Sequence, residues 1–514
     1  MNLGVAVTRE AQRRPNALAL FSLNFQCTYS ELDTRTNQIA RWFRTTHQLE
    51  SGDRLAVLLP NRCEVVEHLT AAHKAALVYV GLNFRMDEGD LRTVFENAEP
   101  RLLVTCEEFR STAESLLQSF GVPFVMIEDI TKDIAGSPLT TVSDAPLRIF
   151  PASSDHACIV YTSGTTGRPK GVLFDHSAMS QHATVACLEY EITPDTRYLI
   201  QIPHNSSVNI TIAPCLMMGA AIGFQDSRSF SPDTFASVVA DFCVTHSFLV
   251  PTQLMRVLDQ LSDSDGRLAS LTTLGYGSSP ISPDRLRDLV ARYGAIFLQL
   301  YGMAEIASIG TILRKTDHER ALNEKPALLN SCGRPSYGVA VRVVDDKGND
   351  VPVGERGEVI FAGPHVMLGY YRDEKRTSDA LYDGWMHSGD IGVFDDEGYL
   401  YIVDRLKNLI IRGGLNIAPV EIENVIYRHP SVLEVAVVGA PDEEWGERIV
   451  AVVARTTHGS VTEQELLQLC NESELASIKC PVEIRFVESL PKNAVGKIDK
   501  QSVRNQFWTG TRQV

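Results

Sequence analysis

The chain has 514 residues, of which 44% are hydrophobic and 22% are charged, so it is long enough for two or more folded domains. Its net charge of −16 argues against a general nucleic-acid binder, which needs a basic surface. The sequence lacks the roughly 20 consecutive apolar residues of a membrane span and the apolar core of a signal peptide. We therefore expect a cytoplasmic monomer or homodimer without nucleic-acid or membrane partners.

Short apolar runs alternate with helical patterns over roughly the first 300 residues. The runs are short and do not alternate with polar residues, which indicates strands that are covered on both faces. They are residues 54–60, 101–106, 122–127, 158–163, 248–252, 272–277 and 295–302. Ser231-Pro232 and Ser282-Pro283 are typical helix starts, and Gly294 is a typical helix end. This order predicts an α/β domain with parallel sheets flanked by helices.

The pattern changes near residue 390. Residues 392–405 predict a hairpin with Glu397 and Gly398 in its turn. Further on, helical patterns and strand-like runs predict a small α+β domain. These segments are residues 419–428, 432–440, 448–454, 462–471 and 483–488. We place the joint within residues 403–408, so that residues 1–404 form the large domain and residues 405–514 a small, mobile C-terminal domain.

The ten cysteines are scattered from Cys27 to Cys480, with no CxxC pair and no zinc-like spacing to histidine. This spacing predicts reduced and mostly buried thiols.

The stretch TSGTTGRPKG occupies residues 162–171, directly after the apolar run CIVY. A loop that leaves the end of a parallel strand is a common ligand site, and glycines, hydroxyls and a lysine suit phosphate. A Walker loop is excluded, because Gly164 is followed too soon by Gly167 and Lys170 by a glycine. A structural turn stays open as the alternative.

Six further motifs follow in order, and each by itself has an ordinary structural explanation. They are GYGSSP (275–280), YGMAE (301–305), HSGD (387–390), VDRLK (403–407), GGLNIAPVEIE (413–423) and PKNAVGK (491–497). Together with TSGTTGRPKG they resemble the adenylate-forming superfamily of acyl-CoA synthetases, firefly-luciferase-like enzymes and peptide-synthetase adenylation domains. The resemblance covers essentially the whole chain, and it is greatest to an acid–CoA ligase.

The resemblance implies a two-step reaction with ATP, Mg²⁺ and coenzyme A. A carboxylate first attacks the α-phosphate of ATP and gives an acyl-adenylate and pyrophosphate. A thiol then attacks the acyl carbon and releases AMP, after the C-terminal domain has rotated.

The resemblance also implies a role for each matching residue. Thr162, Ser163, Gly164, Thr165, Thr166 and Lys170 would bind the β- and γ-phosphates. Tyr301 would stack on adenine, with Gly277, Ser278, Ser279 and Gly302 beside it, and Asp390 and Arg405 would bind the ribose. Glu305 would bind Mg²⁺, Lys497 would bridge the carboxylate and the α-phosphate, and Lys407 would lie at the hinge. Gly413 and Gly414 would line the tunnel of the thiol arm. Apart from the resemblance, Trp445 is a candidate to stack on a base of coenzyme A, and a partly buried structural tryptophan stays open as the alternative.

The sequence departs from the superfamily pattern at two places. Ala304 stands where a threonine normally contacts the α-phosphate, so we expect weaker adenylation unless Ser308 or Thr311 compensates. Ile478 and Cys480 stand where some relatives bind the coenzyme A nucleotide with an aromatic residue and an arginine. Trp445 and Lys479 are the remaining candidates there, and a carrier-protein thiol stays open as the acceptor.

The acid would bind near residues 201–211, with His204 close to its carboxylate. Because no aspartate occurs between residues 196 and 225 to pair with an ammonium group, an α-amino acid is not expected. The polar stretch favours a medium-sized aryl, alicyclic or acyl carboxylate with some oxygenation. The expected substrate-binding residues are His204, Asn205, Asn209, Tyr276, Gly277, Met303 and Ala304.

Three functions are compatible with these motifs. The first is an acid–CoA ligase, for which Lys497, Glu305 and His204 would be the catalytic residues. The second is a stand-alone adenylating enzyme that loads a carrier protein or supports a luciferase-like oxidation. The third is an adenylate-binding protein that has lost catalysis, of which Ala304 would be the first sign.

Overall fold

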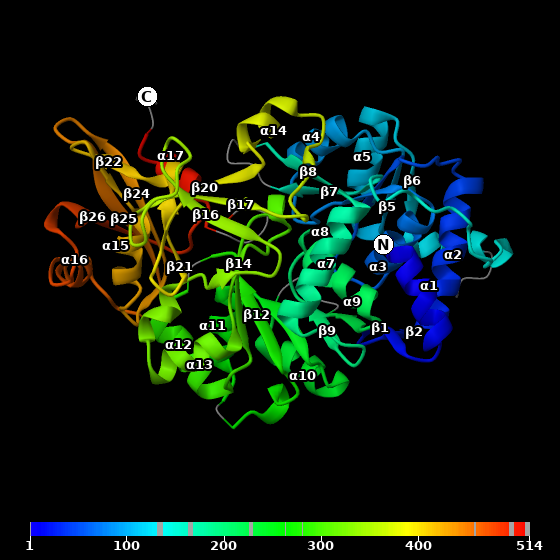
Figure 1. Cartoon of the computed structure of the whole chain (residues 1–514), viewed down its shortest axis with the longest axis horizontal. Coiled ribbons are helices and arrows are strands. Elements are labelled where there is room, and N and C mark those ends of the chain that lie inside the picture. The colour runs from blue at the N-terminus through cyan, green and yellow to red at the C-terminus, as the bar shows by residue number, and fades with distance from the viewer. Residues whose placement is uncertain are drawn as a thin grey trace.

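The computed structural model describes residues 2–130, 137–162, 168–225, 230–262, 264–279, 281–456, 459–492 and 498–508, with the side chains of Ser207, Asn209 and Lys407 left aside. Three sheets, of nine, seven and five strands, form the large N-terminal part, and a second five-stranded sheet forms the C-terminal part. Figure 1 shows the C-terminal sheet at one end of the molecule and the N-terminus in the other half. None of the helices in the described part of the chain combines the length and hydropathy that a membrane crossing requires.

The nine-stranded sheet has the order β15-β14-β13-β12-β11-β9-β10-β1-β2. Its strands are β1 (Leu18–Ser22), β2 (Phe25–Thr28), β9 (Arg197–Ile200), β10 (Ala221–Phe224), β11 (His246–Leu249), β12 (Thr273–Gly277), β13 (Phe297–Tyr301), β14 (Thr311–Leu313) and β15 (Arg334–Pro335). The strands from β1 to β13 along this order are parallel, and the edge strands are antiparallel.

The seven-stranded sheet has the order β18-β8-β7-β4-β3-β5-β6. Its strands are β3 (Arg54–Leu58), β4 (Val78–Gly81), β5 (Leu102–Thr105), β6 (Phe124–Met126), β7 (His156–Thr162), β8 (Lys170–Asp175) and β18 (Gly369–Tyr370). Alternate residues of β3 enter different clusters, Leu55 and Val57 on one face and Ala56 and Leu58 on the other. This strand is therefore covered on both faces, as its unbroken apolar run predicts.

The expected parallel strands and both Ser-Pro helices are confirmed. In α10 (Pro232–Phe242) the Ser231 side chain accepts a hydrogen bond from the Thr234 N–H. In α12 (Pro283–Tyr293) Ser282 is the N-cap residue without such a bond, and Gly294 ends the helix with a φ of 77°. The thiols agree with the expectation as well, because the ten cysteines are free and only Cys243 is exposed.

The other helices lie on the faces of these sheets or connect their strands. The α-helices of the large part are α1 (Leu3–Arg13), α2 (Tyr29–Thr45), α3 (Glu64–Lys74), α4 (Glu88–Ala98), α5 (Arg110–Phe120), α6 (Ile127–Ile130), α7 (His176–Tyr190), α8 (His204–Ser207), α9 (Ala213–Met218), α11 (Pro251–Gln260), α13 (Lys315–Asn323) and α14 (Glu374–Ala380). The short helices are η1 (Glu107–Phe109), η2 (Pro138–Thr141), the π-helical η3 (Val208–Ile212), η4 (Gly266–Leu268), η5 (Ala304–Ile306), η6 (Pro326–Asn330), η7 (Leu406–Asn408) and η8 (Ser477–Lys479).

An antiparallel sheet between residues 340 and 405 was not anticipated from the sequence, apart from its last hairpin. Its strands are β16 (Ala340–Val344), β17 (Gly357–Ala362), β19 (Leu381–Tyr382), β20 (Trp385–Phe394) and β21 (Leu400–Arg405). The expected hairpin is confirmed as β20–β21, with Gly398 in its turn at a φ of 79°.

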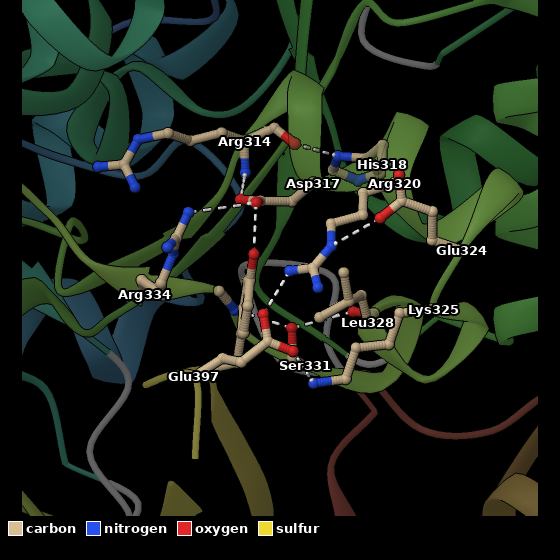
Figure 2. Close-up of polar contacts among 12 residues, drawn as sticks. Arg314, Asp317, His318, Arg320, Glu324, Lys325, Leu328, Ser331, Arg334 and Glu397 are labelled. Atoms are coloured by element: carbon tan, nitrogen blue, oxygen red, sulfur yellow. Dashed lines mark hydrogen bonds and ion pairs between the residues drawn. The ribbon is translucent and has the colours of Figure 1, made fainter. Parts of the chain in front are cut away.

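Polar contacts hold this hairpin against α13 and η6 (Figure 2). The Tyr399 hydroxyl donates to Asp317 Oδ1 at 2.7 Å, and the Arg314 N–H donates to Asp317 Oδ2 at 2.9 Å. Lys325 pairs with Glu397 at 2.7 Å. The hairpin that carries the expected ribose-binding residues is thus fixed to the large part of the molecule.

The C-terminal sheet contains β22 (Ile410–Arg412), β23 (Leu415–Ile417), β24 (Val432–Asp442), β25 (Gly446–Arg455) and β26 (Glu483–Val487). Three helices accompany it, α15 (Pro419–Ile426), α16 (Glu463–Asn471) and α17 (Lys500–Asn505). The sheet has its own apolar clusters on both faces, so this part has the core of a separate domain.

Candidate active site

Glu305 lies in η5, four residues beyond the end of β13, and only 6% of it is exposed. The Tyr370 hydroxyl donates to Glu305 Oε1 at 2.6 Å, and the Met367 N–H donates to the Glu305 backbone oxygen at 2.8 Å. Lys170 Nζ lies 5.1 Å from the centre of the Tyr370 ring. The tyrosine therefore joins the lysine of the glycine-rich stretch to the carboxylate expected to bind Mg²⁺.

Tyr301, Asp390 and Arg405 form a second cluster. The Tyr301 hydroxyl donates to Asp390 Oδ2 at 2.7 Å, and Arg405 Nε donates to Asp390 Oδ1 at 2.9 Å. Burial raises the pKa of Tyr301 well above its usual value, and the neighbouring Asp390 charge adds to the shift, so the hydroxyl stays protonated. The structure thus brings the expected adenine and ribose residues together.

Two glycines bring the backbones of this region close to each other. A Cβ on Gly277 would lie 2.4 Å from the Leu300 oxygen, and one on Gly302 would lie 2.7 Å from the Ser308 carbonyl carbon. Ser278, the residue after β12, has a φ of 74°, and both it and Ser279 are exposed. The ends of β12 and β13 therefore form a tightly packed, backbone-lined edge.

His204 is fully buried at the start of α8. The ring Nδ1 of His204 lies 3.3 Å from the Tyr79 hydroxyl, and the backbone N–H of His204 donates to Asn61 Oδ1 at 2.9 Å. Burial lowers its pKa to about 4, so the imidazole is neutral at pH 7. Asn205 is 3% exposed, and its side-chain oxygen has no hydrogen-bond partner in the described part of the chain.

Tyr276 does not lie as the sequence suggested. Its ring is buried with Leu274 in the cluster beneath α10–α12, and its hydroxyl contacts His318 Nε2 at 2.8 Å. Gly275 lies on the other face, where a Cβ would meet Tyr190 of α7 at 2.9 Å. Tyr276 was expected to bind the substrate, and since its ring lies on the face away from α7, a contact with the acid on the α7 face would have to come from its backbone.

Thr311 cannot replace the hydroxyl that Ala304 lacks. Its side chain is fully buried and donates to the Cys332 oxygen at 2.6 Å. Ser308, half-buried and only four residues beyond Ala304, remains the candidate. Met303 and Ala304 themselves are half-buried against the main core.

In the C-terminal part, Gly413 and Gly414 form the turn of the β22–β23 hairpin, with φ values of 57° and 79°. A Cβ on Gly413 would lie 2.7 Å from Trp445, which is 41% exposed. Lys479 pairs with Glu421, and Cys480 is buried in the C-terminal core. Trp445 is thus the more accessible of the two candidates for a coenzyme A contact.

Several expected site residues cannot be placed. Ser163, Gly164, Thr165, Thr166 and Lys497 lie outside the described residues, as do the side chains of Asn209 and Lys407. Thr162, the last residue of β7, pairs with Lys170 of β8. In the described ranges, no group of three or more His, Cys, Asp and Glu side chains is arranged to hold a metal ion.

Tyr370 and Tyr79 were missed by the sequence analysis. Each contacts an expected site residue that is distant in the chain, Glu305 and His204 respectively. No local pattern connects these pairs, and the only sequence signal for Tyr370 is its position next to Gly369.

Comparison with known proteins agrees with this geometry. The family described as AMP-binding enzyme matches residues 7–371, and the AMP-binding enzyme C-terminal domain matches residues 421–497. A feruloyl-CoA synthase from Amycolatopsis sp is 34% identical over 98% of this chain and 99% of its own length. The fatty acid–[acyl-carrier-protein] ligase ScoC from Streptomyces coeruleorubidus is 30% identical over 97% of this chain and 95% of its own length.

Among solved structures, ATP-bound MatB from Rhodopseudomonas palustris superposes with a TM-score of 0.88 and 28% identity, covering 99% of both chains. The matches extend over both the large part and the C-terminal part of the chain. The chain therefore belongs to the adenylate-forming superfamily of AMP-binding enzymes and is an AMP-forming enzyme of the acid–CoA ligase family.

Proposed function

We propose that the protein activates a carboxylic acid with ATP to an acyl-adenylate and then transfers the acyl group to coenzyme A, releasing pyrophosphate and AMP. The observation that carries the proposal is the gathering of two charged clusters near the end of β13, Glu305–Tyr370–Lys170 and Tyr301–Asp390–Arg405. Such a site can bind the phosphates and the nucleoside of ATP at one edge of the sheets.

The residues around ATP would have distinct tasks. Asp390 would accept hydrogen bonds from the ribose hydroxyls, and Tyr301 would lie against adenine. Thr162, Lys170 and the residues between them would neutralise the phosphates, and Lys497 would stabilise the charge that develops on the reacting oxygens. Domain alternation about a joint near Lys407, with the boundary between residues 404 and 405, would bring Lys497 in for the first step and Gly413 and Gly414 in for the second.

Glu305 suits Mg²⁺, because a hard cation prefers carboxylate oxygen and this carboxylate is held in place by Tyr370. Bound there, Mg²⁺ would supply charge neutralisation for the phosphates. Tyr370 would keep the carboxylate oriented, and the Met367 contact would keep the η5 turn in position.

The acid would be a medium-sized aryl, alicyclic or acyl carboxylate with some oxygenation. Neutral His204 and the unpaired Asn205 oxygen support a polar, uncharged pocket wall. The feruloyl-CoA synthase match supports an oxygenated aryl acid. The ScoC match favours the second candidate, transfer to a carrier-protein thiol. The third candidate is a catalytically weakened homologue, which the missing hydroxyl at Ala304 supports.

One assay separates these candidates, namely acid-dependent pyrophosphate release with and without coenzyme A. Release followed by thioester formation is the result we expect. Adenylate without thioester would favour the carrier protein, and no release with any acid would favour the weakened homologue. Lys497→Ala should abolish release, whereas Lys492→Ala, which removes a partly exposed lysine paired with Glu434, should leave it near the wild-type rate.

A further inference from the structure

Two buried histidines, which the activity described so far does not use, face each other beside the candidate active site. His182 lies on α7, and His365 lies between β17 and β18, with exposed fractions of 1% and 0%. Their ring centres are 5.6 Å apart. Within the described ranges, neither ring nitrogen of His182 has a hydrogen-bond partner, and the contact of His365 with the Ile309 backbone does not reach good hydrogen-bond geometry. Buried polar atoms nearly always have a partner, so the ring nitrogens of this pair that lack one point to a bound molecule.

The pair lies between the two segments that would enclose the acid. His365 is close to the backbone of Ile309, and two residues further on, the Met367 N–H donates to the Glu305 backbone at 2.8 Å. On the other side, α7 packs against η3, which directly follows α8 and His204. The side chain of Tyr190, the last residue of α7, packs against Gly275 of β12. The histidines therefore lie between the Glu305 turn on one side and the segment of η3 and His204 on the other.

The pKa values of both rings are lowered chiefly by burial. Burial lowers the pKa of His182 to about 3, with His365 as the second cause, and burial lowers the pKa of His365 as well. No carboxylate or cation contributes to either shift. Both rings are neutral at pH 7, so each offers one N–H donor and one acceptor nitrogen. Neither ring carries the positive charge that would compensate a second carboxylate in this buried place, so an uncharged oxygen group suits the pair better.

We propose that His182 and His365 bind an uncharged oxygen group, a hydroxyl or a carbonyl, on the acid substrate at a distance from its reacting carboxylate. The pair would select an oxygenated acid over the analogue that lacks the oxygen. This inference rests on the proposed function and names the class of acid that the site takes.

The experiment compares matched acids in the pyrophosphate-release assay. The pairs are 4-hydroxycinnamate with cinnamate, 4-hydroxybenzoate with benzoate, and 8-hydroxyoctanoate with octanoate. In the pair that the wild type handles best, we expect kcat/KM to favour the oxygenated acid by at least about tenfold. His182→Leu and His365→Leu should bring this ratio close to 1 while cinnamate, benzoate or octanoate is still activated.

His68→Leu is the matched control. His68 is equally buried on α3 and also has an unpaired ring nitrogen, but it packs beside Phe43 rather than beside α7. This variant should keep the wild-type ratio. If a leucine variant does not fold, His182→Gln and His365→Gln give the same comparison, since glutamine keeps polar atoms but changes their positions.

The proposal is overturned if the wild type shows no preference in any pair, because the histidines would then hold only water. It is also overturned if the leucine variants keep the preference, or if a dicarboxylic acid such as 4-carboxycinnamate is preferred and the preference depends on the pair. In each of these three outcomes the enzyme still releases pyrophosphate, so the proposed function stands. Absence of release with every acid overturns the proposed function as well, so the two failures are distinguishable.

Discussion

Tyr370 shows how one residue can organise a site that the chain assembles from distant segments. Its hydroxyl holds Glu305, and its ring lies under Lys170, so the two expected ends of the phosphate site are joined through one side chain. Burial raises the pKa of Tyr370, and the neighbouring Glu305 charge adds to the shift. The tyrosine therefore remains a hydrogen-bond donor at neutral pH and keeps the carboxylate in one orientation.

At Ala304, restoring the missing hydroxyl should accelerate adenylation. A hydrogen bond to a charged group contributes about 1.5–3 kcal/mol, so Ala304→Thr should raise the rate of acid-dependent pyrophosphate release by roughly 10- to 100-fold. Ser308→Ala serves as the companion variant. If Ser308 supplies the missing contact, its removal should slow the wild type and have little effect in the Ala304→Thr background. An unchanged or lower rate for Ala304→Thr would rule out the idea.

Among the elements, the β20–β21 hairpin has the clearest positioning role. Asp390 and Arg405 lie at its base and pair with each other, while its other end is held by the hydrogen bond that Tyr399 donates to the buried Asp317. Fixing both ends keeps the carboxylate proposed to bind the ribose aligned with Tyr301 of β13. In the proposed domain alternation, the hairpin would be the stationary side of the joint.

Tyr399→Phe tests this anchoring. The change removes one hydrogen bond from the buried Asp317 carboxylate and should cost about 1–3 kcal/mol of folding free energy. Because the hairpin carries Asp390, the KM for ATP should rise while the KM for the acid changes less. Glu397→Gln is the control, since its ion pairs with Arg320 and Lys325 are solvent-accessible and contribute little. Equal effects of the two variants on the KM for ATP would contradict the role.

The β22–β23 hairpin gives a prediction for the second step. Gly413 has a left-handed backbone, and a Cβ there would lie 2.7 Å from the Trp445 side chain. Gly413→Ala should therefore displace Trp445 and slow thioester formation by at least about tenfold, while acyl-adenylate formation stays near the wild-type rate. Gly398→Ala is matched in backbone strain, at a φ of 79°, but its Cβ would meet nothing within 4 Å. The measurement is the rapid-quench rate of each half-reaction in both variants. A Gly413→Ala variant that is slowed only in acyl-adenylate formation would contradict the prediction.

The elements that the sequence predicts best are those with local signals. The apolar run at residues 54–60 becomes β3, and Ser231-Pro232 starts α10, because strand burial and helix capping are written into neighbouring residues. Strand β18 was missed, since it has only two residues and pairs with β8, far back along the chain. Strands β16, β17 and β19 were missed as well, although their partners lie nearby in the sequence.

The candidate site divides in the same way. Glu305, Asp390 and Tyr301 could be named from motifs, and the structure brings the last two together. Tyr370, His182 and His365 could not be named, because each becomes notable only through a neighbour that lies about 65 residues away or more. The direction of the Tyr276 side chain could not be predicted for a related reason, because a motif does not tell which face of a strand lies toward α7.

At the scale of the whole molecule, the buried histidines are concentrated in the large N-terminal part. Burial lowers the pKa to about 4 for five of them and to about 3 for two. The first group is His68, His176, His204, His246 and His318, and the second is His73 and His182. Unfolding exposes these rings, and their pKa then returns to about 6.5, so the unfolded state binds more protons in the interval between. Stability is therefore complete above about pH 6.5 and falls as the pH is lowered towards 4.

This uneven distribution predicts that acid destabilises the N-terminal domain before the C-terminal one. Each histidine contributes a slope of up to about 1.4 kcal/mol per pH unit in the interval between its folded and unfolded pKa. In calorimetric scans between pH 7 and pH 4.5, we expect the larger transition to move to lower temperature faster than the smaller one. His246→Gln removes one buried ring and should lower the proton uptake on unfolding at pH 5 by about one proton. A larger acid shift of the C-terminal transition, or an unchanged uptake in that variant, would show that other groups control the response.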